Sequence, residues 1–68
     1  SAASDVYKRQ VEEATARKEW MIARIALIEG RQRGVEHGTS EYSRLQKAVD
    51  YYAAQVSKYE AKLERLNA

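Results

Sequence analysis

Residues 42–66 read YSRLQKAVDYYAAQVSKYEAKLERL, and apolar side chains recur along this stretch at alternating steps of three and four residues. The repeat consists of Tyr42, Leu45, Val49, Tyr52, Val56, Tyr59, Leu63 and Leu66. Such a repeat is typical of helices that pack against each other along their length. The stretch has neither Gly nor Pro and is rich in alanine, a strong helix former. It therefore predicts a helix over about residues 41–66, roughly 39 Å long, with Ser40 as its N-cap.

The residues upstream repeat the same spacing and predict a second helix. The members of this repeat are Val11, Ala14, Lys18, Met21, Ile25 and Ile28. We call the two repeats together the seam. Lys18 is its one polar member, and its aliphatic stem can lie along the seam while its ammonium stays in water. Ile22 and Ala26 are expected to widen this face of the helix.

A second apolar strip, formed by Trp20, Ala23 and Leu27, lies about 100° around the first helix from the seam. Tyr51, next to Tyr52, also falls outside the seam. A helix that is apolar on two sides usually has two neighbours, and aromatic side chains dominate the energetics of protein interfaces. We therefore expect Trp20, Leu27 and Tyr51 to form a protein interface, in a homo-oligomer or with a larger partner.

The segment between the two predicted helices, EGRQRGVEHGTSE at residues 29–41, is rich in glycine. Gly30 or Gly34 is the expected stop of the first helix, in the left-handed conformation. A connection at about 30–39 is short, so the helices should return antiparallel. The predicted fold is an all-α, two-helix antiparallel hairpin that resembles a coiled coil. A minimal β-hairpin in the connection, anchored by Val35, is the alternative.

The first ten residues, SAASDVYKRQ, resemble a translated reading frame of a transposase-based sequencing adapter, without a mismatch. We therefore expect residues 1–10 to be an adapter-derived scar and residues 11–68 to be a single, N-terminally truncated hairpin domain. The scar can still extend the first helix, with Ser4 as a cap and Tyr7 on the seam. We expect its first three residues to be frayed or extended.

Few residues offer chemistry of their own. The chain has no Cys, so it has neither disulfides nor thiolate metal sites, and no apolar run is long enough to cross a membrane. His37 lies near Glu36 and Glu41, but this spacing matches no helical pair of metal ligands, and a solvated loop histidine is expected. The glycines lack the following Lys-Ser/Thr of a phosphate loop. We therefore expect no enzyme activity, catalytic residue, metal or cofactor.

A basic cluster is the main alternative site. Arg24, Arg31 and Arg33 fall at or near the tip of the predicted hairpin, with His37 close by, and could contact phosphates. The competing interpretation is a solvated tip whose positive charge is diluted by Glu29, Glu36 and Glu41. The removal of Lys8, Arg9 and Asp5 with the scar also lowers the formal net charge of +2 by one. A small nucleic-acid-binding hairpin or dimer is therefore an alternative, as is a fragment of a longer coiled-coil protein.

Two fragments carry a family resemblance. Residues 12–32, EEATARKEWMIARIALIEGRQ, have a Trp ten residues before a Gly that is expected to close the helix, and residues 48–63, AVDYYAAQVSKYEAKL, have an aromatic start and a heptad tail. This layout resembles the short helical structural proteins of tailed phages and prophages, some similar to the W-type head–tail joining proteins. Those relatives carry a longer segment, with an aromatic residue and a β-hairpin, where this chain has RGVEHGTSEY at residues 33–42.

The resemblance implies a non-enzymatic assembly or adaptor protein of virion morphogenesis, of the head–tail connection type. It implies partners among copies of the chain or larger virion proteins, and a location in the cytoplasm of a bacterial host or in a virion. It implies structural or interface roles for Trp20, Gly30, Asp50 and Tyr51.

Overall fold

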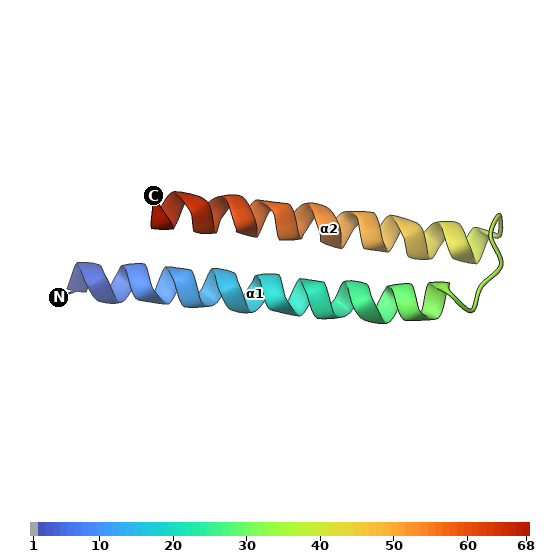
Figure 1. The fold of residues 1–68 in the computed structure, drawn as a ribbon, viewed down its shortest axis with the longest axis horizontal. Coiled ribbons are helices and arrows are strands. Elements are labelled where there is room, and N and C mark those ends of the chain that lie inside the picture. Colours follow the sequence, from blue (N-terminus) through green and yellow to red (C-terminus); the bar gives the residue numbers. More distant parts are fainter. Residues whose placement is uncertain (1) are drawn as a thin grey trace.

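The computed structural model describes residues 2–68 and consists of two antiparallel helices, α1 (Ala2–Gln32) and α2 (Ser40–Asn67), joined by residues 33–39 (Figure 1). The two ends of the chain lie at the same end of a rod of 54 × 16 × 13 Å. Residues 2–68 contain no strand. The predicted all-α hairpin is therefore confirmed, and the alternative of a β-hairpin around Val35 is wrong.

The seam joins the two helices as its spacing predicted. Every seam residue of both helices is buried or half-buried, and the same spacing continues beyond Ile28 to the buried Gln32. The ammonium of Lys18 lies 3.6 Å from a carboxylate oxygen of Glu60, at the edge of the seam. Ala14 and Val49 are the only apolar side chains within residues 2–68 that are buried. The hairpin therefore has a continuous but thin core.

The N-cap of α2 is Thr39, and the prediction of Ser40 is wrong by one residue. Thr39 has an extended backbone, with φ −87° and ψ 158°, whereas Ser40 is already helical. The Thr39 hydroxyl accepts a hydrogen bond from the backbone N–H of Tyr42 at 3.2 Å and donates one to the carbonyl of Glu36 at 2.8 Å. The cap therefore also fixes the end of the connection to the start of the helix.

The glycines end α1 differently from the prediction. The helix runs through Gly30 to Gln32, and neither Gly30 nor Gly34 adopts the left-handed conformation. Gly38 is the glycine with a positive φ, of 86°, directly before the cap of α2. Helix α1 closes through turns with ordinary backbone angles, in which the N–H of Val35 donates to the carbonyl of Gln32 at 3.1 Å. Because Gln32 is buried against α2, the helix extends two residues past Gly30.

The expected fraying of the first three residues is wrong for Ala2 and Ala3, which are helical, while Ser1 lies outside the described residues. Ser4, expected as a cap, lies inside α1. Tyr7 reaches the far end of α2, where its hydroxyl donates a hydrogen bond to Oδ1 of Asn67 at 2.5 Å. Residues 2–10 therefore continue the helix, and all of them are exposed.

Candidate interaction surface

The seam divides the remaining surface of the hairpin into two long flanks. If the seam residues occupy positions a and d of a heptad, antiparallel packing places positions c and g of both helices on one flank and b and e on the other. We call the c and g side the aromatic–basic flank. Its large side chains are Arg17, Trp20, Arg24, Leu27 and Arg31 from α1, and Arg44, Tyr51, Lys58, Lys62 and Arg65 from α2.

The aromatic side chains of this flank meet at mid-length. The Trp20 ring stands edge-on to Tyr52 with 6.1 Å between ring centroids, and Tyr51 stands edge-on to the same ring at 5.4 Å. Trp20 is nevertheless 56% exposed, Tyr51 60% and Leu27 67%. The three predicted interface residues therefore lie on one flank, and the hairpin itself leaves them open to solvent.

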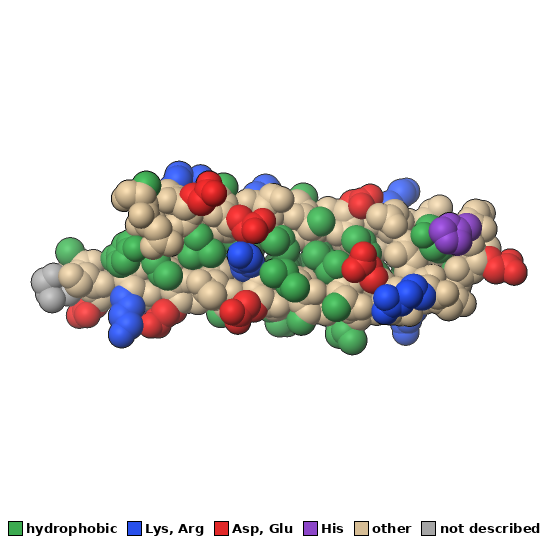
Figure 2. Space-filling view, viewed as in Figure 1, with side chains coloured by type: hydrophobic (Ala, Val, Ile, Leu, Met, Phe, Trp, Pro, Cys, Tyr) green, Lys and Arg blue, Asp and Glu red, His purple; other side chains and the backbone are tan. Residues whose placement is uncertain are grey.

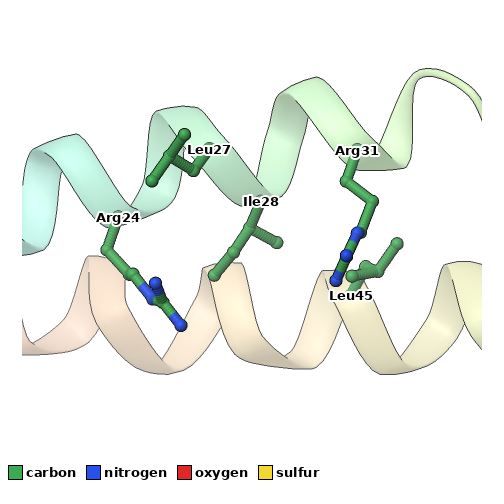
Figure 3. A pocket seen from close by; sticks show the side chains of 5 residues that line it. All are labelled: Arg24, Leu27, Ile28, Arg31 and Leu45. Carbon is green, nitrogen blue, oxygen red and sulfur yellow. The ribbon is translucent and has the colours of Figure 1, made fainter.

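Arg24 and Arg31 border an open groove on the same flank. The groove has a volume of about 410 Å³ and is lined by Arg24, Leu27, Ile28, Arg31 and Leu45. In Figure 3 both guanidinium groups extend from α1 toward α2, one on each side of Ile28. Arg33 lies apart, in a hollow of about 200 Å³ that Gln32, Val35, His37 and Tyr42 also line. The structure thus brings two of the three predicted arginines together, because a spacing of seven keeps them on one side of α1, and separates the third.

Further cations surround Tyr59 near the open end of the hairpin. Lys58, Lys62 and Arg65 line a groove of about 380 Å³ with Tyr59, Gln55 and Ala61. The pKa of Arg17 is raised by the hydroxyl of Tyr59 and by the carboxylate of Glu13, and the Arg17 Nη2 to Glu13 Oε1 distance is 3.1 Å.

The predicted site residues did not include the cations around Tyr59, because the repeat within one helix does not reveal which side chains of the other helix lie beside it. Arg17, Arg24 and Arg31 recur every seven residues in α1. Lys58, Lys62 and Arg65 follow positions c and g of α2. These regular spacings were the signal, and together with the antiparallel pairing they predict that both sets share one flank.

The opposite side, which we call the acidic flank, carries the carboxylates of positions b and e. They are Glu12, Glu19, Glu29, Asp50, Glu60 and Glu64. A hydrogen bond bridges the helices here, because the Gln32 amide donates to Gln46 at 2.8 Å. Within α2, the Gln46 amide donates to Asp50 at 2.9 Å. Ile22, expected to widen the seam, lies on this flank and is 46% exposed. One broad face of the hairpin shows a hydrophobic band between the helices, with Asp and Glu side chains on both sides of it (Figure 2).

The tip of the hairpin has the one histidine. The His37 ring lies 4.3 Å from the Tyr42 ring, tilted by 30°. Within residues 2–68, no three His, Cys, Asp or Glu side chains gather closely enough to hold a metal ion. Neither of the two helices within residues 2–68 is long and apolar enough to cross a membrane. His37 is exposed, and its ring contacts Tyr42.

No protein-family model, curated protein or solved structure matches this chain. The resemblance to phage structural proteins stays a prediction based on residues 12–32 and 48–63. Of the residues it singles out, Trp20 and Tyr51 lie on the aromatic–basic flank, Asp50 accepts the hydrogen bond from Gln46, and Gly30 lies inside α1. The expectation that Gly30 closes the helix is wrong.

Proposed function

We propose that the protein is a non-catalytic assembly or adaptor module that acts by burying its aromatic–basic flank against another protein. The observation that carries this proposal is the exposure of Trp20, Leu27 and Tyr51 on one side of the hairpin. Trp, Tyr and Arg are the residues most enriched at the energetic centres of protein interfaces. All three types occur on this flank within two turns of α1 and the facing turn of α2.

The small core of the hairpin supports the same proposal. The chain exposes 5296 Å² of surface, whereas a compact monomer of its mass is expected to expose about 4,400 Å². Burying one large apolar side chain contributes about 1.5–3 kcal/mol, a sizeable share of the stability of a small domain. Association through Trp20 and its neighbours would therefore stabilise the hairpin as well as the complex.

The family resemblance extends the proposal to virion morphogenesis, with a head–tail connection as the expected setting. The genes that flank the reading frame test this part. Neighbouring portal, terminase or capsid genes would support it, and a metabolic operon would contradict it.

Sedimentation of the wild type and of Trp20→Ser at tens of micromolar tests the assembly role. We expect the wild type to sediment above its monomer mass of 7.8 kDa, and Trp20→Ser to shift toward the monomer. Lys47→Ser is the matched control, because Lys47 is exposed at position f, away from both flanks. An assembly that survives Trp20→Ser unchanged would show that another surface is used.

Nucleic-acid binding is the second candidate function. The observation that favours it is the gathering of Lys and Arg side chains along one flank, beyond the three arginines near the tip. Titration with duplex DNA and structured RNA at low and moderate salt is the test, since phosphate contacts give a steep salt dependence. Binding tighter than micromolar that weakens steeply with salt would favour this function over assembly.

A further inference from the structure

The geometry points to a specific occupant of the aromatic–basic flank: the acidic flank of a second copy of this chain, laid beside the first in the same orientation. This inference names the partner in the proposed assembly function and rests on that function. It is carried by the separation of charge between the flanks, by an apolar receiving surface on the acidic flank, and by the matching heights of the two surfaces along the rod.

The charges of the two helices separate by flank from residue 11 onward. Positions c and g hold the cations Arg17, Arg24, Arg31, Arg44, Lys58, Lys62 and Arg65. Positions b and e of the same segment hold carboxylates and no Lys or Arg, and the Lys18 ammonium reaches this flank from the seam, where it lies 3.6 Å from Glu60. Two carboxylates, Glu13 and Glu41, depart from this pattern, and Glu13 is paired with Arg17. Opposite potentials on two sides of one rod favour contact between unlike flanks, since like charges in juxtaposition oppose association.

The acidic flank also offers a surface that can receive aromatic side chains. Ile22 is 46% exposed there, and the small side chains of Ala26 and Ala53 beside it are exposed. Ile22 and Ala53 lie near the height of Trp20, because Ile22 is two residues from Trp20 in α1 and Ala53 follows Tyr52, which Trp20 contacts. A neighbouring copy in the same orientation and at the same height would therefore set its Trp20 over Ile22 and Ala53.

The same alignment brings charges of opposite sign to equal heights. Lys18 contacts Glu60 and Arg17 precedes Lys18 in α1, so Arg17 and Glu60 lie at nearly the same level on opposite flanks. Arg31 and Glu29 share a level because they are two residues apart in α1. A second copy placed beside the first, without displacement along the rod, therefore matches both the apolar and the charged parts of the two flanks.

Such a contact joins two different surfaces. In a row of copies, the aromatic–basic flank of one end copy and the acidic flank of the other end copy therefore remain free. Repetition therefore either closes into a ring or continues as a filament, whereas a symmetric pair formed through one flank would stop at two copies. The assembly should accordingly grow beyond a dimer with concentration, and it should weaken as salt screens the charges.

Charge reversal in two complementary variants tests the inference. The first variant carries Arg24→Glu and Arg31→Glu on the aromatic–basic flank, and the second carries Glu19→Lys and Glu29→Lys on the acidic flank. Each alone should be monomeric at a concentration where the wild type assembles, with a dissociation constant raised at least tenfold. An equimolar mixture should recover the mass of the wild-type assembly, because each reversed flank then meets its reversed counterpart.

Circular dichroism of each variant alone establishes that the hairpin is folded. The neutral variants Arg24→Gln with Arg31→Gln and Glu19→Gln with Glu29→Gln provide the same comparison without like-charge repulsion. Each of these two neutral double variants should assemble more weakly than the wild type. If both assemble with wild-type affinity, the inference is overturned.

The other outcomes separate this inference from the proposed function. If the Glu19→Lys, Glu29→Lys variant assembles like the wild type while Trp20→Ser does not, the acidic flank is not the occupant, and assembly through Trp20 still stands. If the wild type is monomeric, a second copy is excluded as the occupant. If that monomer also binds structured RNA with a steep salt dependence, the assembly function fails too.

Discussion

The two flanks of the hairpin share one backbone and one seam, yet their side chains are engaged differently. On the acidic flank, a hydrogen bond from Gln32 to Gln46 and the pairing of Lys18 with Glu60 join the helices, and Gln46 donates to Asp50 within α2. On the aromatic–basic flank the largest apolar groups remain open, and the contacts of Trp20 and Tyr51 are edge contacts with one tyrosine ring. The acidic flank adds polar contacts between the helices beside the seam, and the aromatic–basic flank leaves Trp20, Leu27 and Tyr51 exposed.

This difference separates the residues that make the fold from those that we propose make the complex. An exposed Trp or Leu contributes little to the stability of the isolated hairpin, whereas its burial against a partner contributes several-fold more. The comparison predicts that substitutions on the two flanks, and in the seam that they share, have separable effects on unfolding and on association.

The largest effect is expected in the seam, because a substitution that unfolds the hairpin there disrupts both flanks at once. Val49→Asp places a carboxylate at the most buried position of α2, where Val49 is 9% exposed. An uncompensated buried charge costs about 3 kcal/mol or more, which is comparable to the stability that so small a core is expected to supply. We expect loss of helicity and of cooperative thermal unfolding by circular dichroism. Ala54→Asp, on the exposed outer side of the same helix, should remain folded.

A smaller effect is expected in the connection, which fixes how the flanks of the two helices align. Gly38→Ala forces a side chain onto a backbone with φ of 86° and should lower the free energy of unfolding by about 1–2 kcal/mol. Gly30→Ala should raise it by about 0.5–1 kcal/mol, because Gly30 is helical and the added Cβ would lie 3.7 Å from the Arg33 guanidinium, an ordinary contact. Chemical denaturation of both variants measures the sign of each change in the free energy of unfolding. A destabilising Gly30→Ala would mean that the position needs glycine, as the phage resemblance implies.

The seam and the antiparallel pairing could be predicted because periodicity encodes them directly. A repeat of three and four states which side of each helix is buried, and a short connection permits one return direction. The half-buried position of Lys18 followed from the same logic, since its long stem can fill a seam position, but the pairing of its ammonium with Glu60 was not predicted. Exposure of Trp20 outside the seam was predictable for the same reason.

The helix ends and the composition of the flanks needed tertiary information. Thr39 and Ser40 are both good caps, and the choice depends on which residue stays extended, which the contact of Thr39 with Glu36 decides. Gly30 resembled a stop, but the cross-helix contact of Gln32 with Gln46 carries α1 past it. The gathering of cations into one flank follows only when the two heptads are combined in their antiparallel order.

A third prediction compares the flanks directly in the monomer. Gln32→Ala removes the buried amide that donates to Gln46 and should lower the free energy of unfolding by about 1 kcal/mol. Arg24→Ala, on the other flank, removes a side chain that is exposed and should change the free energy of unfolding by less than about 0.5 kcal/mol. Both are measured by denaturation below the concentration at which the wild type assembles. Equal costs for the two substitutions would contradict the division of roles between the flanks.

The smallest effect is expected from removing residues 1–10, because the proposed contact between copies uses none of them. Residues 2–10 are all exposed, and the hydrogen bond from Tyr7 to Asn67 is exposed as well, so its net contribution is at most about 1 kcal/mol. A chain that begins at Val11 should therefore keep α2, the remainder of α1 and the wild-type tendency to associate. Far-ultraviolet circular dichroism and sedimentation provide the measurements, with Tyr7→Phe as the control that removes the hydroxyl alone. Loss of helicity in the shortened chain, with Tyr7→Phe unaffected, would show that this first stretch of α1 stabilises the hairpin through its length and not through the contact with Asn67.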